Sequence, residues 1–167
     1  ALGTTLFPGL PAAMGDDDEV AVDLPTSWSN GFPFYGVNYT SITVGSNGAI
    51  SFNSGANIGY SNTCLPATGF GMAEVMWHWD DLNPSNALTG GVFAWHDTAN
   101  DRFIISWESV PHYPGTGAGT YQAQLYPSGE IQFHWEDTDF GTAIDNVVGS
   151  ATIGIQDSIG GTQAAGT

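Results

Sequence analysis

The chain has 167 residues, enough for one domain with a sizeable core, and 41% of them are hydrophobic. Its 17 acidic residues face a single basic residue, Arg102, which gives a formal net charge of −16 at pH 7. This charge repels phosphate backbones and anionic lipid headgroups, so it argues against nucleic acid and a bare membrane as partners. It attracts cations, calcium among them, and it is equally typical of the acidic surface of a secreted protein.

The first 17 residues are predicted to be an irregular lead-in that ends in an acidic run, and residues 18–167 a single domain. The chain opens on "ALGTTLFPGLP" without methionine, and no signal peptide and no long apolar span are seen in it. We therefore expect a mature domain or a piece excised from a longer precursor.

From residue 19 onward, short runs rich in β-branched and aromatic residues alternate in polarity and are separated by clusters of Gly, Pro, Asn and Asp. This period of two predicts strands, whereas helical periodicity is almost absent. In "SITVGSNGAISFN" (41–53), Asn47-Gly48 tolerates the positive φ of a tight hairpin turn. Other strands are predicted at 19–24, 73–79, 90–97, 101–109, 119–127, 130–137 and 150–157. The pattern predicts an all-β fold, an antiparallel sandwich or barrel, with little or no helix.

The strand predicted at 73–79, "AEVMWHW", should place Val75, Trp77 and Trp79 on one face and Met76 and His78 on the other. It leads directly into the polar turn "DDLNPSN". Long connections without strand periodicity are expected at 54–72, 110–119 and 138–148.

Several fragments, taken in order, resemble a known family. "LPTSWSNGFPFYGVNYTSITVGSNGAISF" resembles the opening of β-rich modules of large secreted bacterial proteins. "VMWHWDDLNPS", "GGVFAWHD", "RFIISWESV", "TYQAQLYPSGEIQFHW" and "ATIGIQD" resemble the successive strands of the nidogen-like extracellular domain, over roughly residues 18–160. The resemblance implies a secreted or cell-surface β-sandwich, jelly-roll-like or nidogen-like, excised from a larger protein. It implies a role in adhesion, matrix contact or assistance to a neighbouring domain, and it supplies no ligand-binding or catalytic residue to carry over.

Two acidic segments are candidates for calcium, which takes about six to eight oxygen ligands, largely carboxylates and carbonyls. Asp80, Asp81 and Asn83 follow directly on a predicted strand and are the first candidate metal site. The alternative is an Asp turn whose carboxylates accept backbone N–H groups. The run 16–19 is the second candidate, and its alternative is a solvated acidic turn.

The candidate ligand-binding residues are Trp28, Tyr113, Asp80 and Asp81. Trp28 and Tyr113 lie in predicted loops and are therefore expected to be exposed, so that a sugar ring could stack on them while the aspartates bond its hydroxyls. The remaining strand tryptophans are expected to pack in the core or across strands; they are Trp77, Trp95, Trp107 and Trp135.

The other reactive side chains lack a recognisable catalytic or metal-binding spacing. Each of the four histidines, His78, His96, His112 and His134, lies next to an aromatic residue. His78, His96 and His134 occupy strand positions beside Trp and could bind zinc only if their strands were neighbours; the alternative is half-exposed histidines on the solvent face. Cys64 has no disulfide partner within the chain and is expected to be a buried thiol. Arg102 is expected to pair with an aspartate of its hairpin. Because no G-x-S-x-G, H-E-x-x-H or phosphate-loop pattern is present, we expect no enzyme.

The sequence thus predicts a non-catalytic extracellular module for recognition or adhesion. It would bind a carbohydrate or a protein on a cell surface or matrix, with calcium assisting, and it would not insert into a membrane. The alternative is a structural spacer or accessory domain of a larger secreted protein, without a ligand of its own.

Overall fold

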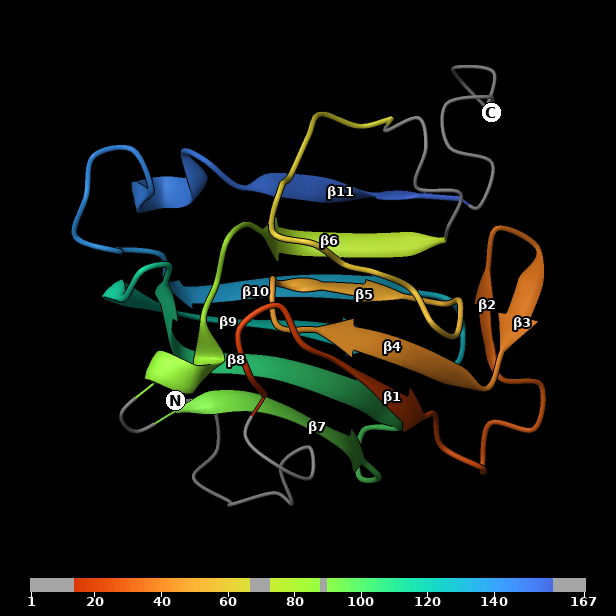
Figure 1. The fold of residues 1–167 in the computed structure, drawn as a ribbon. Helices are drawn as coiled ribbons and strands as arrows, with labels where there is room; N and C mark the ends of the chain where they lie inside the picture. Colours follow the sequence, from red (N-terminus) through yellow and green to blue (C-terminus); the bar gives the residue numbers. More distant parts are fainter. Residues whose placement is uncertain (1–13, 67–72, 88–89, 158–167) are drawn as a thin grey trace.

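The computed structural model describes residues 14–66, 73–87 and 90–157, and these contain strands, two short 3-10 helices and no α-helix (Figure 1). The strands are β1 (Glu19–Asp23), β2 (Phe32–Phe34), β3 (Val37–Tyr39), β4 (Ser41–Gly45), β5 (Ala49–Ser51), β6 (Glu74–Trp79), β7 (Gly91–Asp97), β8 (Arg102–His112), β9 (Thr116–Leu125), β10 (Ile131–Asp137) and β11 (Thr152–Gln156). The helices are η1 (Pro84–Asn86) and η2 (Asn146–Val148).

The strands form two antiparallel sheets and one small hairpin. The larger sheet has the order β1-β4-β5-β6-β11, the smaller sheet has the order β10-β9-β8-β7, and β2 pairs with β3. The β2–β3 hairpin lies at one end of the molecule, and the chain between β6 and β7 lies at the other (Figure 1). One hydrophobic core joins residues of both sheets, so the expected antiparallel β-sandwich is confirmed.

The core is built from alternate side chains of the facing strands. Trp77 of β6 meets Trp107 of β8 with ring centroids 4.6 Å apart and an interplanar angle of 70°. Both rings are completely buried, and the Trp107 indole N–H donates to the carbonyl of Ser46 at 3.0 Å. The expectation of core packing is confirmed for these two tryptophans. Trp135 of β10 is 42% exposed and is therefore not a core residue, but its indole N–H donates to the carbonyl of Trp77 at 3.0 Å and its ring meets Phe133 edge-on.

Strand β6 contains a bulge. Gly154 of β11 pairs with Met76, and Thr152 pairs with Trp79. The register therefore advances by three residues on β6 and by only two on β11. A bulge of this kind inserts one residue and reverses the facing of all side chains that follow it in the strand.

The bulge changes which side chains of β6 enter the sandwich. Trp77 and His78 both face inward, and the His78 ring stacks on Tyr121 with centroids 4.8 Å apart. Met76 and Trp79 instead pack in a separate cluster on the outside of the larger sheet. The predicted facing of His78 and Trp79 is therefore wrong, because alternation was counted through the inserted residue.

The predicted turn at Asn47-Gly48 is present, and both of its residues are buried. Gly48 has φ +74°, and a Cβ there would lie 2.0 Å from the carbonyl oxygen of His78. The Asn47 amide donates to Asp17 Oδ1 at 2.8 Å, and its oxygen accepts the N–H of Leu82 at 2.9 Å. The Asn47 side chain therefore connects the turn before β1, at Asp17, to the segment that follows β6, at Leu82.

The connection predicted at 110–119 is wrong, because β8 continues to His112 and β9 already begins at Thr116. The glycines that suggested a loop serve packing instead: a Cβ on Gly119 would lie 2.5 Å from the Phe140 ring. The irregular connection at 138–148 is confirmed, as is the part of 54–72 that the structure describes. In that part Cys64 is exposed, so the buried thiol is also wrong.

Candidate functional site

Three segments meet at one end of the sandwich. The N–H of Tyr113 donates to the carbonyl of Asp81 at 2.8 Å, and the N–H of Asn83 donates to the carbonyl of Pro111 at 2.9 Å. Asn47 connects the lead-in turn to the same place. We call this region the loop end; it comprises residues 15–18, 80–86 and 111–115.

Three carboxylates converge at the loop end. Oxygens of Asp16, Asp17 and Asp81 all lie within 4.8 Å of one another. Burial raises the pKa of Asp81, and the charges of Asp17 and Asp16 raise it further. Burial and then the charge of Asp17 also raise the pKa of Asp16. The two acidic segments that the sequence offered as separate calcium candidates thus contribute to one group, the acidic cluster.

Asp80 and Asn83 have other roles. Asp80 is buried, and its carboxylate accepts hydrogen bonds from the hydroxyl of Ser150 and from the N–H of Asp81. The Asn83 side-chain oxygen accepts the N–H of Ser85 at 3.0 Å and caps η1. Of the predicted calcium set of Asp80, Asp81 and Asn83, the structure brings only Asp81 into the acidic cluster, because successive residues at the strand end face different sides.

Behind the loop end, His78 is enclosed between the two sheets. It has no exposed surface, and among the described residues neither ring nitrogen has a hydrogen-bond partner. Its ring lies against Tyr121 and Phe140, with centroids 4.8 and 5.2 Å away. Burial lowers the pKa of His78 to about 4, although the nearby Asp80 charge acts in the opposite direction. The alternative of a half-exposed histidine is wrong here.

His112 attaches the connection before β11 to the loop end. Its Nε2 lies 3.4 Å from Asp80 Oδ1 and 3.9 Å from Asp145 Oδ1, and its Nδ1 lies 2.7 Å from the Tyr113 carbonyl oxygen. Its ring also meets Phe140 edge-on at 5.9 Å. The only group of three or more metal-ligating side chains with suitable spacing in the described parts of the chain is the acidic cluster, so the histidines form no zinc site there.

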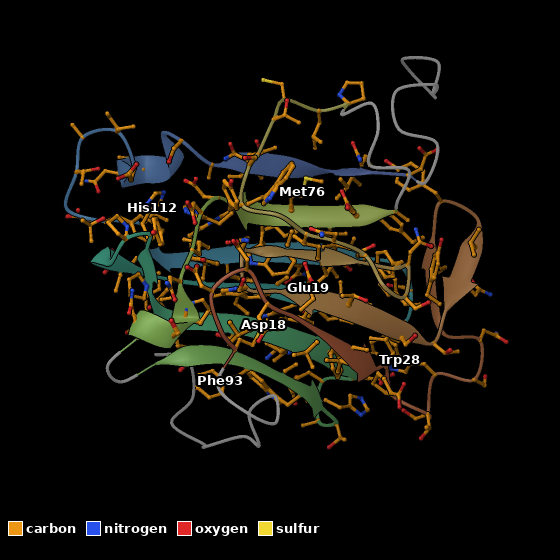
Figure 2. All side chains as sticks on the ribbon, in the orientation of Figure 1. Asp18, Glu19, Trp28, Met76, Phe93 and His112 are labelled. Atoms are coloured by element: carbon orange, nitrogen blue, oxygen red, sulfur yellow. The ribbon has the colours of Figure 1, made fainter. Side chains whose placement is uncertain are left out.

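The two aromatic candidates have opposite environments. Tyr113 is 48% exposed, as expected. Trp28 is only 6% exposed, and it lies on the opposite side of the molecule from His112 (Figure 2). Its indole N–H donates to Asp101 Oδ1 at 2.8 Å and its ring packs edge-on against His96. The expected exposure of Trp28 is therefore wrong, because the β7–β8 hairpin covers it, and it has no open face on which a sugar could stack.

The outer face of the four-stranded sheet carries a set of polar side chains that sequence reasoning missed. Gln122 and Gln124 of β9 are 2% and 5% exposed although they point away from the core. Gln122 pairs with His134 and Gln124 with Gln132 on β10. The signal was in the sequence as the alternating "QAQ" and "QFH", whose polar members share one face of adjacent strands.

These side chains are bonded to one another. Arg102 Nη1 donates to Gln124 Oε1 at 2.7 Å, and its Nε donates to Asp97 Oδ2 at 2.9 Å. The expected pairing of Arg102 with a hairpin aspartate is thus confirmed. The Tyr126 hydroxyl lies 3.1 Å from Gln124 Oε1 and 3.3 Å from Gln132 Oε1.

Comparison with known proteins agrees with this architecture. None of the described helices has the length and apolar character needed to span a bilayer. Neither a curated protein nor a solved structure matches the chain. A family model described as NIDO related matches residues 3–167. Because this match spans almost the whole chain, the protein belongs to the NIDO-related family, whose domains are of the extracellular type.

Proposed function

We propose that this extracellular-type domain is a non-catalytic recognition module that binds a carbohydrate or a protein of a cell surface or matrix at its loop end, with calcium assisting. The observation that carries this proposal is the convergence of Asp16, Asp17 and Asp81, together with the backbone bond that joins Asp81 to the exposed Tyr113.

Calcium is supported by the charges of the acidic cluster. Carboxylates this close repel one another: burial is the larger cause of the raised pKa values of Asp16 and Asp81, and the charge of Asp17 raises both further. Asp17 accepts from the neutral amide of Asn47, and the charge of His112 lowers the pKa of Asp81, whereas Arg102, the single basic residue of the chain, is bonded to Asp97. A hard divalent cation with oxygen ligands would remove this repulsion and would tie the lead-in turn to the exit of β6.

Ligand recognition is supported by the neighbourhood of Tyr113. Its N–H is bonded to the carbonyl of Asp81, so the aromatic ring and the acidic cluster belong to connected backbone segments. An exposed tyrosine offers an apolar ring face and a hydroxyl group, a combination that suits binding surfaces. Sites on loops that a rigid sandwich holds in place are a common location for recognition.

The calcium part is tested by thermal unfolding with millimolar calcium or with a chelator. We expect calcium to raise the melting temperature, since a ligand present at about 100 times its Kd stabilises the folded state by about 2.7 kcal/mol. Asp17→Asn should remove the calcium response, whereas Asp23→Asn, the same charge change at an exposed position of β1, should keep it. An unchanged midpoint in the wild-type domain would refute calcium binding.

The recognition part is tested with a glycan and matrix-protein array, probed with and without calcium. We expect calcium-dependent signals that Tyr113→Ala abolishes. Tyr35→Ala, which removes a tyrosine of similar exposure at the β2–β3 hairpin, should leave them unchanged. If the folded domain gave no signal on any ligand, the recognition function would be wrong and a spacer role would be favoured.

A further inference from the structure

We infer that the free edge of β11 is a second binding site, which takes an extended, basic segment of a partner protein as an added strand of the larger sheet. This site does not depend on the proposed function, because it uses no residue of the loop end. It rests on the backbone of β11, on the apolar side chains beside it and on the carboxylates of β10.

β11 is an edge strand of the larger sheet, since β6 is the strand that pairs with it among the described residues. Edge strands commonly carry charged residues, which hinder the addition of another strand. The other edge strands of the two sheets, β1, β7 and β10, all contain carboxylates. β11, with the sequence TIGIQ, contains none. It is therefore the edge at which an added strand meets the least hindrance.

The β5–β6 ladder shows in which direction the residues of β6 form hydrogen bonds. The N–H of Phe52 donates to the carbonyl of Ala73, its register partner just before β6, at 2.8 Å. In an antiparallel ladder, bonded pairs of this kind recur at every second residue. Val75 therefore directs its N–H and carbonyl toward β5, and Met76 directs its own toward β11.

The same alternation leaves backbone groups of two β11 residues unpaired. Met76 is the register partner of Gly154, so the N–H and carbonyl of Gly154 point to β6. Those of Ile153 and Ile155 point the other way, to the free edge, where no described strand or loop bonds them. An added strand can bond these groups, which is how extended peptides join an exposed sheet edge.

The side chains of Ile153 and Ile155 face the inner side of the larger sheet. The intervening Gly154 faces the outside, because a Cβ there would lie 2.5 Å from Cδ1 of Leu65, which packs in the cluster on that side. Ile153 and Ile155 are nevertheless 42% and 45% exposed. Figure 1 shows the reason: β11 extends beyond the smaller sheet, whose edge strand β10 lies lower in that view.

Trp135 of β10 extends this apolar surface. Its indole N–H donates to the carbonyl of Trp77 at 3.0 Å, and the register places Trp77 in the bulge opposite Ile153. Trp135 is 42% exposed and thus lies beside the exposed isoleucines. We call Trp135, Ile153 and Ile155 the apolar edge. Since alternate side chains of a strand face the same side, an added strand would place every second residue against it.

The charges around the apolar edge select a basic partner. Glu136 and Asp137 follow Trp135 directly on β10 and are exposed, as is Asp139. Arg102, the only basic residue of the chain, is bonded within its own hairpin and on β9, and the net charge is −16. Lys or Arg side chains at the ends of an added strand would therefore be attracted, whereas an acidic segment or a second copy of this chain would be repelled.

The test is titration of the whole domain, in chelator, into the fluorescently labelled peptide Lys-Lys-Val-Thr-Val-Thr-Val-Lys-Lys, followed by anisotropy. We expect saturable binding that weakens as the salt concentration rises, and at least tenfold weaker binding of the peptide in which glutamates replace the lysines. Amide hydrogen exchange locates the peptide. Saturation should slow exchange at Ile153 and Ile155 at least tenfold, and by less at Gly154, which is already bonded to β6.

Ile153→Lys should weaken binding of the lysine-flanked peptide at least tenfold, because it places a positive charge in the apolar edge. Ile155→Pro should do the same, because it removes an outward N–H that β6 does not use. Ile153 is 42% exposed, so its variant tests the site even if Ile155→Pro does not fold. Ile144→Lys is the matched control: it makes the same change at a residue that is 76% exposed and outside the apolar edge, and it should leave binding unchanged.

Absence of saturable binding, equal affinity of wild type and Ile153→Lys, or equal binding of the two peptides would each overturn the inference. Self-association of the domain alone that Ile153→Lys abolishes would also overturn it, because the edge would then pair with a second copy. Tyr113→Ala should leave peptide binding unchanged. Array signals that require calcium and Tyr113 would still stand if the peptide failed to bind, so this test and that of the loop end can fail separately.

Discussion

Replacing Glu74 with glutamine removes an ionisable group that is only 2% exposed on β6. Among the described residues, one of its carboxylate oxygens has no hydrogen-bond partner. Burial raises the pKa of Glu74 from 4.5 to about 7. The folded state therefore holds this proton more tightly than the unfolded state does. The contribution of Glu74 to stability is complete below pH 4.5 and is lost as the pH rises to about 7.

The size of this loss follows from the shift. At 1.36 kcal/mol per pKa unit, a rise of about 2.5 units lowers the free energy of unfolding by about 3 kcal/mol at pH 8. At pH 5 the carboxyl group is still mostly protonated in the folded state, so the loss of unfolding free energy is only about 1 kcal/mol. Glutamine does not titrate, so the stability of Glu74→Gln relative to wild type should increase by about 2 kcal/mol between pH 5 and pH 8.

The assay is urea unfolding followed by tryptophan fluorescence at several pH values, with the free energy extrapolated to water. Glu136→Gln is the control, because Glu136 is exposed on β10 and its replacement should leave the pH dependence unchanged. A difference between Glu74→Gln and wild type that is the same at pH 5 and pH 8 would show that the buried carboxyl group does not titrate in this range.

Two further predictions concern β6 and the turn beside it. His78→Phe keeps a ring against Tyr121 but does not titrate. Because the pKa of His78 falls from 6.5 in the unfolded state to about 4 in the folded state, His78 lowers the stability of the wild type as the pH falls from 6.5 to 4. The variant should therefore gain about 3 kcal/mol over the wild type at pH 4. Parallel pH profiles of the two proteins in urea unfolding would contradict this. Gly48→Ala would place a Cβ 2.0 Å from the carbonyl oxygen of His78. The positive φ alone should lower the free energy of unfolding by about 1–2 kcal/mol, and the clash should lower it further. Gly36→Ala, with φ +81° and no atom within 4 Å, should show only that strain, and equal melting temperatures for the two variants would refute the clash.

The alternation of side chains was sufficient to predict an antiparallel all-β fold, and the family resemblance favoured a sandwich over a barrel. Regular runs such as β9 and β10 show their facing directly in the sequence, because each inward residue is apolar. The continuation of β8 to His112 was missed, because Pro111 and the nearby glycines are typical of loops. Gly117 and Gly119 leave room for Phe140, which lies about 20 residues later in the sequence.

The candidate site could be predicted only in part. Both acidic segments were visible as runs of aspartate, but their meeting depends on Asn47, whose side chain lies between them in space and outside both in sequence. The exposure of Trp28 was misjudged for a related reason. Its loop position was correct, but a hydrogen bond to Asp101, 73 residues later, places its ring under the β7–β8 hairpin.

The bulge in β6 has a consequence at the end of that strand. With uninterrupted alternation after Trp77, Asp80 would point outward and Asp81 inward. The inserted residue shifts the phase by one, so Asp80 enters the buried contacts with Ser150 and His112 while Asp81 joins the acidic cluster. A single backbone irregularity therefore decides which of two adjacent aspartates is buried in the interior and which lies in the acidic cluster. Deleting one residue within the bulge would exchange their positions.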